Sequence, residues 1–267
     1  MKVQSLLLPT VLGATSVAAA NAEAMDALMM KKEQSWARAE QAGAFGGSKK
    51  YPKQTTLNKC TNGYAGEYMC NNVDLYGFLS HEDLGSETLR GNDVWGWTSQ
   101  DGREFGIVGQ TDGVGFVEIN QKGDLSYLGR LDTYTTNTSW RDIKVIKNHA
   151  YIGAESPGHG IQIFDLTKLL SADPAAPKEY DPLRDLTSHF YGVGATHNLV
   201  AHEETDMIYA VGGREGANSR NTTCAGGLFM IDVSDPAKPV SPGCVGSAGY
   251  VHDAQVRITL VIFVRKN

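Results

Sequence analysis

Four pairs of polar residues recur from residue 92 onwards and contain the side chains best suited to chemistry. Successive pairs are roughly 50 residues apart, and each opens an apolar segment. Carboxylate and imidazole groups can bind a divalent metal ion, and a bound metal ion can activate water. The pairs are Asn92-Asp93, Arg141-Asp142, His197-Asn198 and His252-Asp253, and the candidate metal ligands among them are Asp93, Asp142, His197, His252 and Asp253.

The same pairs also suit a structural role. Polar side chains at the starts of strands satisfy loop amides and can connect neighbouring sheets. The sequence contains no G-x-S-x-G and no H-E-x-x-H, and no phosphate-binding loop follows Gly212-Gly213. We therefore expect no identified catalytic residue, and both interpretations of the pairs stay open.

The elements that position these pairs form an internal repeat. Each unit contains a first strand with the polar pair, a second strand that ends in Gly, and a third strand that ends in Asn or Asp. Short strands separated by turns predict an all-β fold. Small sheets repeated about every 50 residues are typical of β-propeller blades. The third strands contain few polar residues, as strands covered on both faces do, and comprise residues 116–119, 161–164 and 228–231.

Three units and the start of a fourth predict an incomplete β-propeller over residues 83–267, because closed rings usually have about four to eight blades. The fourth unit starts at Val251. The run after Gln255 lacks the turn signals of the repeats, so we expect a truncated or misread end. The loops at His159, at Thr111-Asp112-Gly113 and at Gly212-Gly213-Arg214-Glu215 occupy equivalent places and predict one binding face.

Two of these segments resemble LVIVD-type repeats, in which an apolar strand ends in Asp. They are Gly160-Ile-Gln-Ile-Phe-Asp-Leu166 and Leu228-Phe-Met-Ile-Asp-Val-Ser-Asp-Pro236. With the Cys60–Cys70 segment, Val73-Asp74-Leu75 and Trp95-Gly96-Trp97, the chain from Cys60 to Gln255 is similar to the choice-of-anchor B family of secreted or surface proteins. The resemblance implies a β-propeller in an extracellular location and no established activity or catalytic residue.

The N-terminus predicts a secretory signal peptide over residues 1–22. Lys2 precedes an apolar run, and Ala20-Asn21-Ala22 fits a cleavage site between small residues. A membrane anchor is the competing interpretation, but the apolar run is short and contains Pro9. We therefore expect a mature chain with no transmembrane helix.

The four cysteines support an oxidising compartment. An even number of cysteines in a secreted chain predicts disulfides, and sequence proximity favours Cys60–Cys70 and Cys224–Cys244. A zinc site is the alternative, although no C-x-x-C pair occurs. Two sequons predict N-glycosylation, at Asn137 and Asn221.

The remaining segments precede the repeats. Residues 23–50 predict a helix over 23–42 with an apolar stripe at Leu28, Met29 and Trp36, followed by a Gly-rich linker. A docked helix and a mobile spacer fit this segment equally well. Residues 51–82 predict a small disulfide-linked unit.

These features favour a secreted or cell-surface binding or adhesion protein. The net charge is −6 and no basic stripe occurs, so we expect no nucleic-acid partner. The expected partner is a cell-wall or surface protein or glycan. The alternatives are a metal-assisted hydrolase or lyase, with a divalent metal at the mouth of the propeller channel, and a structural wall component without a ligand.

Overall fold

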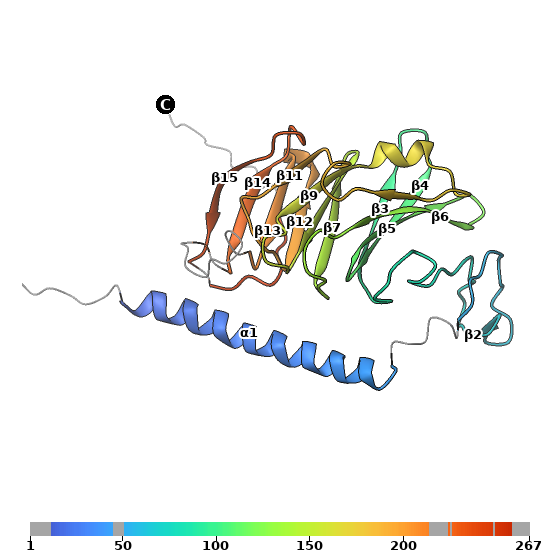
Figure 1. Ribbon diagram of the computed structural model, residues 1–267, viewed down its shortest axis with the longest axis horizontal. Helices are drawn as coiled ribbons and strands as arrows, with labels where there is room; N and C mark the ends of the chain where they lie inside the picture. The colour runs from blue at the N-terminus through green and yellow to red at the C-terminus, as the bar shows by residue number, and fades with distance from the viewer. Residues whose placement is uncertain (1–11, 45–50, 214–223, 225, 248, 258–267) are drawn as a thin grey trace, which may run out of the picture.

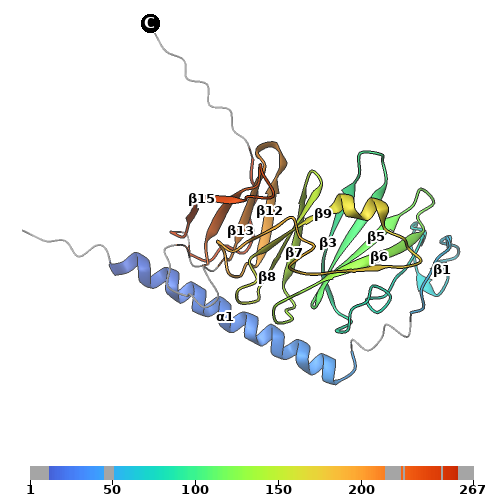
Figure 2. The same cartoon turned by 45° about the horizontal axis from the view of Figure 1, so that its top comes forward.

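A computed structural model of the chain describes residues 12–44, 51–213, 224, 226–247 and 249–257. Four β-sheets and one long helix dominate these residues (Figures 1 and 2). The predicted all-β class with an N-terminal helix is thus confirmed. Helix α1 (Leu12–Gln41) starts within the predicted signal peptide and extends through almost all of the predicted helix over 23–42.

Three larger sheets follow one another along the chain, and each contains four antiparallel strands in sequence order. The first consists of β3 (Gly91–Thr98), β4 (Glu104–Gln110), β5 (Gly113–Ile119) and β6 (Leu125–Asp132), with β10 (Lys178–Tyr180) added parallel to β6. The second consists of β7 (Arg141–Ile146), β8 (His149–Ala154), β9 (Ile161–Asp165) and β11 (Ser188–Phe190). The third consists of β12 (Asn198–His202), β13 (Met207–Val211), β14 (Leu228–Asp232) and β15 (Val240–Val245).

The shorter elements lie in the connections. The 3-10 helices are η2 (Leu166–Ser171) and η3 (Glu203–Thr205), and the fourth sheet is the hairpin of β1 (Tyr64–Ala65) and β2 (Tyr68–Met69). Gly129 lets β10 approach β6: its φ is +141°, and a Cβ there would lie 2.1 Å from the carbonyl oxygen of Lys178. A larger residue at position 129 would therefore displace β10.

The three larger sheets stand side by side, with their first strands β3, β7 and β12 next to one another (Figures 1 and 2). Two apolar cores fill the spaces between them. The core between the first and second sheets contains Phe116 stacked on Phe164, with ring centroids 4.8 Å apart, and Tyr180 against the edge of both rings. The core between the second and third sheets includes Ile163, Leu199, Phe229 and Ile231.

Burial of the third strands follows from this arrangement. In the second sheet, residues 161–164 of β9 are all buried, as predicted for a strand covered on both faces. In the first sheet, only the first half of the predicted range 116–119 is buried, and Glu118 and Ile119 of β5 are half-buried. In the third sheet, β14 instead alternates between buried and half-buried residues. Among the described residues no further sheet packs beyond β14, so one face of this strand is less covered.

Both predicted disulfides are present. Cys60 is bonded to Cys70 across the hairpin of β1 and β2, and Cys224 is bonded to Cys244 in β15. No free cysteine occurs in the described part of the chain. Within that part, α1 included, no helix combines the length and the apolar character needed to cross a membrane.

The predicted fourth repeat is described only at its start. Residues 249–257 contain no strand, and residues 258–267, which include most of the run after Gln255, lie outside the described residues.

The packing between sheets predicts which aromatic residues the fold needs. Replacing Phe164 with Ala removes a fully buried ring between Phe116 and Tyr180 and should lower the free energy of unfolding by about 3–5 kcal/mol. The control Val94→Ala, at a side chain 63% exposed, should cost less than about 1 kcal/mol. Chemical denaturation followed by fluorescence measures both, and equal losses would contradict the assigned core.

Candidate functional site

The carboxylates of the repeated pairs connect the first strands of neighbouring sheets. Asp93 in β3 accepts a hydrogen bond of 2.9 Å at Oδ2 from the backbone N–H of Ile143 in β7. Asp142 in β7 likewise accepts at Oδ2 from the backbone N–H of Leu199 in β12. Each contact joins two separate sheets, which is the structural role that the residues suggested.

The amides of the pairs make a second set of such contacts. Asn92 donates from its side chain to the carbonyl oxygen of Arg141, and Asn198 donates to that of His252 over 3.1 Å. The last contact places residue 252 beside the third sheet, where the next first strand of a repeat would stand.

Asp93 and Asp142 share one cation. Lys144 lies with Nζ 2.7 Å from Asp142 Oδ1 and 3.8 Å from Asp93 Oδ2, and its ammonium is 4.4 Å from the ring centroid of Trp95. Burial, with a further contribution from Asp93, raises the pKa of the Asp142 carboxyl to about 6, while Lys144 opposes this shift. The carboxylates are therefore already engaged by a backbone N–H and an ammonium.

The two histidines of the pairs form a separate contact. His197 is buried, and its Nε2 lies 2.9 Å from Nε2 of the exposed His252. Its Nδ1 lies 2.9 Å from Oε1 of Glu155, which follows β8. The Glu155 carboxylate accepts a hydrogen bond from Nδ1–H of His197, which orients the ring so that Nε2 faces His252.

The five predicted metal ligands are thus placed in two contacting pairs and one separate residue. Asp93 contacts Asp142 through the shared Lys144, and His197 contacts His252, whereas the exposed Asp253 accepts a hydrogen bond from the N–H of Ala254. Within the described ranges, no group of three or more His, Cys, Asp or Glu side chains is arranged to hold a metal ion.

An aromatic series links the histidine pair to α1. The ring centroid of Trp140, the residue before β7, lies 5.3 Å from that of His197 and 5.1 Å from that of Trp36 in α1. Lys32, one turn before Trp36, has its ammonium 5.4 Å from the centroid of Trp140. Of the predicted apolar stripe of the helix, Met29 is buried and Trp36 half-buried, whereas Leu28 is 46% exposed.

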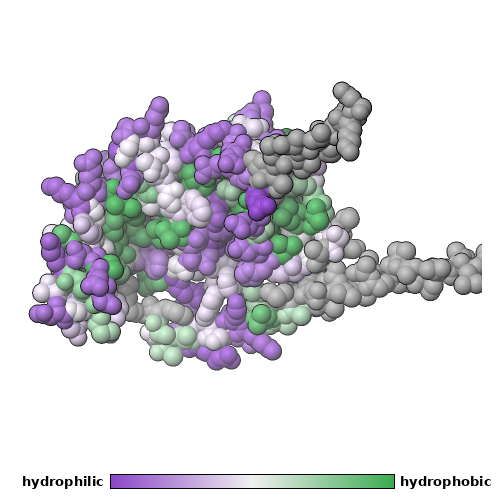
Figure 3. Space-filling model, turned by 180° about the vertical axis from the view of Figure 1, so that it is seen from behind, coloured by the Kyte–Doolittle hydropathy of each residue, from purple (hydrophilic) through white to green (hydrophobic). Residues whose placement is uncertain are grey.

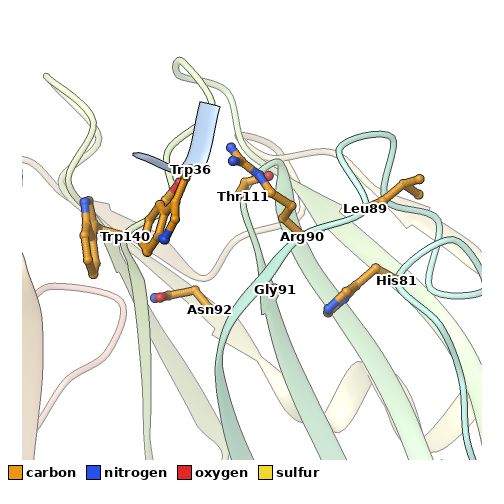
Figure 4. A pocket seen from close by; sticks show the side chains of 9 residues that line it. Trp36, His81, Leu89, Arg90, Gly91, Asn92, Thr111 and Trp140 are labelled. Atoms are coloured by element: carbon orange, nitrogen blue, oxygen red, sulfur yellow. The ribbon is translucent and has the colours of Figure 1, made fainter. Parts of the chain in front are cut away.

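A pocket of about 470 Å³ lies where α1 crosses the starts of the strands. Figure 4 places Trp36 and Trp140 next to each other on one side of it, and His81 and Leu89 on the other. Aromatic walls with a few polar groups are typical of ligand sites. The lining residues are Trp36, His81, Leu89, Arg90, Gly91, Asn92, Thr111, Ser139 and Trp140.

The charges around this pocket are mostly basic. Arg90 is paired with Glu40 of α1 at 3.7 Å, and the Glu40 side chain is 53% exposed. Arg141, which follows the lining residue Trp140, is fully buried and donates from Nε to the carbonyl oxygen of Gln110. Burial lowers the pKa of Arg141 to about 10, so the guanidinium stays charged at neutral pH.

Of the loops predicted to form one binding face, the loop at His159 lies against Arg141. His159 is fully buried, with Nε2 3.5 Å from Arg141 Nη1 and Nδ1 3.1 Å from the hydroxyl of Thr135. Burial and the positive charge of Arg141 lower the pKa of His159 well below its usual value, so the imidazole is neutral. Asp112 instead accepts hydrogen bonds from Ser86 and pairs with Arg130.

Other predicted residues are Asn137 and Asn221 in the sequons and Arg214-Glu215 in a loop. Asn137 is exposed between β6 and β7, where a glycan has room. Asn221 and the Arg214-Glu215 pair lie outside the described residues.

Of the pocket residues, Asn92 and Thr111 belong to segments that the sequence predicts to be functional, whereas most of the others do not. Trp36, His81 and Arg90 all precede the first predicted polar pair and reach the site only through tertiary packing. Trp140 gave a usable signal, since it directly precedes the predicted pair Arg141-Asp142.

Fold and site together define a mostly β repeat protein with a pocket between its N-terminal helix and the starts of its strands. In the space-filling view, apolar residues form small groups between hydrophilic ones rather than one continuous patch (Figure 3). The chain matches no protein-family model, and a search of curated proteins gives no significant match.

The raised pKa of Asp142 predicts a distinct pH dependence of stability. The unfolded carboxyl has a pKa near 3.9, so between roughly pH 4 and 6 the native state binds more protons at this site than the unfolded state. The contribution of Asp142 to stability is therefore lost as the pH rises through this window. Asp142→Asn, whose amide oxygen can still accept from Leu199, should lack this loss.

The measurement is the melting temperature of both proteins between pH 4 and 7. We expect the wild type minus Asp142→Asn difference to fall by a few degrees across that range. Asp173→Asn, at an exposed aspartate, should show no such trend. A difference for Asp142→Asn that stays constant with pH would contradict the assignment.

Proposed function

We propose that this chain is a secreted or cell-surface β-propeller-type protein of the choice-of-anchor B kind that binds a cell-wall or surface glycan or protein. The three larger sheets are its blades, and their first strands line the channel. The partner binds at the mouth of this channel, in the pocket beside α1.

The observation that carries this proposal is the pocket itself. Its walls come from α1, from the segment before β3 and from the segment before β7, so residues far apart in the sequence converge on one space. Two tryptophans, an arginine and several uncharged polar groups give both contact area and directional hydrogen bonds. A surface of this kind can bind a partner without any catalytic residue.

Secretion is supported by independent features. A leader-like N-terminus precedes the cysteines, and both cysteine pairs are bonded. Disulfides persist in oxidising compartments. The exposed sequon at Asn137 is accessible to glycosylation.

A binding screen tests this function. The secreted protein should retain glycans or proteins from an array of wall polysaccharides and a cell-surface extract. Ser139→Trp, which fills the pocket, should abolish retention, whereas Ser241→Trp, at an exposed position in β15, should retain the same partners. Because Ser139 also completes the sequon at Asn137, Asn137→Gln is a second control, and it should retain them too. A screen in which the folded wild type retains nothing would refute the proposal.

A second candidate, a metal-assisted hydrolase or lyase, is favoured by the contact between His197 and His252. The two Nε2 atoms face each other, and Glu155 orients His197 as a carboxylate orients a metal-binding histidine. Elemental analysis of protein dialysed against Zn²⁺ should then give about one ion per chain. His197→Ala and His252→Ala should each abolish uptake, whereas His149→Ala should keep it. Wild-type protein that binds no ion would end this candidate.

A further inference from the structure

We propose that the pocket recognises a saccharide that carries a carboxylate, and that Glu40 of α1 occupies the place of this carboxylate in the free protein. The inference rests on the proposed binding function and adds to it the chemical class of the ligand. Three features carry it: the ion pair at the pocket, the buried arginine beside it, and the uncharged lining.

The ion pair already presents a carboxylate to the pocket. Arg90 lines the pocket, and Glu40 approaches its Nη1 to 3.7 Å, which is longer than a direct charge-assisted hydrogen bond. The Glu40 side chain is 53% exposed and the Arg90 side chain 24% exposed. A partly exposed pair at this distance is weak, so a ligand with its own carboxylate can replace Glu40. The planar guanidinium then offers a two-point contact that an ammonium does not.

The second feature is the buried charge of Arg141. Among the described residues no carboxylate lies within 4.0 Å of its guanidinium, and its Nη2 has no hydrogen-bond partner. Asp112 favours this charge only from beyond that distance, so the buried cation still makes its surroundings favourable for an anion. Arg141 directly follows Trp140 and is bonded to the carbonyl oxygen of Gln110, which directly precedes Thr111. Trp140 and Thr111 both line the pocket, so the field of this charge acts there.

The third feature explains why the ligand is a saccharide rather than a simple acid. Beyond Arg90, the polar lining consists of uncharged groups, namely the hydroxyls of Thr111 and Ser139, the amide of Asn92 and the ring of His81. Burial lowers the pKa of His81, so its imidazole is neutral at pH 7. Sugar rings combine several hydroxyls with an apolar C–H face. The hydroxyls match these uncharged groups, and the C–H face matches the half-buried ring of Trp36.

In the proposed complex, Glu40 and the carboxylate of the ligand compete for the same arginine, Arg90. If Glu40 competes with the ligand for Arg90, then removing its charge should strengthen binding instead of weakening it. A merely structural role of the pair predicts the opposite, because the loss of the Glu40 charge would loosen α1 and with it the wall formed by Trp36.

The probes are tri-galacturonate, its methyl ester and benzoate, measured by isothermal titration calorimetry on the secreted protein at neutral pH. The ester keeps the sugar body without the charge, and benzoate keeps a carboxylate without the sugar. We expect tri-galacturonate to bind at least about tenfold more tightly than either.

The variants separate the two roles of the ion pair. Glu40→Gln should tighten tri-galacturonate binding by about two- to fivefold, whereas Glu33→Gln, at an exposed position on the same helix, should leave it unchanged. Arg90→Lys should weaken binding and Arg90→Ala should weaken it further, by about tenfold or more. Trp36→Ala should also lose at least about tenfold, with Trp95→Ala, outside the pocket, as its control. Thermal unfolding checks that each variant is folded.

Each contrary result has a defined meaning. Equal binding of the acid and the ester, or weaker or unchanged binding by Glu40→Gln, would overturn the carboxylate assignment. If the screen retains a neutral glycan or a protein at the pocket and tri-galacturonate does not bind, the inference is wrong and the proposed function stands. If the screen retains nothing, both are wrong.

Discussion

Three sheets of this protein meet at their first strands, and each meeting requires a carboxylate that accepts a backbone N–H from the next sheet. Asp93 meets Ile143 in this way, and Asp142 meets Leu199. Because these N–H groups have no ladder partner across the gap between sheets, losing either carboxylate would leave a partly or fully buried donor unsatisfied. The contacts set the order and spacing of the sheets, so the loops at the strand starts fall on one side, and the pocket lies on that side.

The apolar packing complements these contacts and fills the space between whole sheets. Phe116 and Phe164 come from third strands of neighbouring sheets and stack directly. The first and third sheets expose more apolar surface than the second sheet, which lies between them. Val94 is 63% exposed in the first sheet, and Val240 is 58% exposed in the third. In the proposed propeller, further sheets would cover such end faces, as the second sheet is covered on both sides here.

The sequence predicted the first three strands of each larger sheet because each carries a local signal: a polar pair, a terminal Gly or a terminal Asp. The fourth strand of the first sheet was also predicted, over residues 125–131, but those of the second and third sheets were harder to predict. β11 has three residues, and β15 contains Pro242 and Gly243, which usually mark turns. The predicted disulfides follow from sequence proximity alone. The pocket could not be predicted in the same way, because its walls combine α1, the segment before β3 and Trp140, and only packing brings these together.

Helix α1 contributes to this site through one face of its second half. Lys32, Trp36 and Glu40 are spaced four residues apart and therefore lie one above another on the helix, and each contacts a residue of the pocket. All three follow the predicted cleavage site after Ala22, so removal of the leader would leave every one of these contacts in place. Because Trp36 forms a wall of the pocket and Glu40 pairs with its arginine, the same helix completes the site and competes for it. The affinity of the proposed site therefore depends on two properties of this helical face. Trp36 must stay packed at the pocket, and Glu40 must release Arg90 to the ligand.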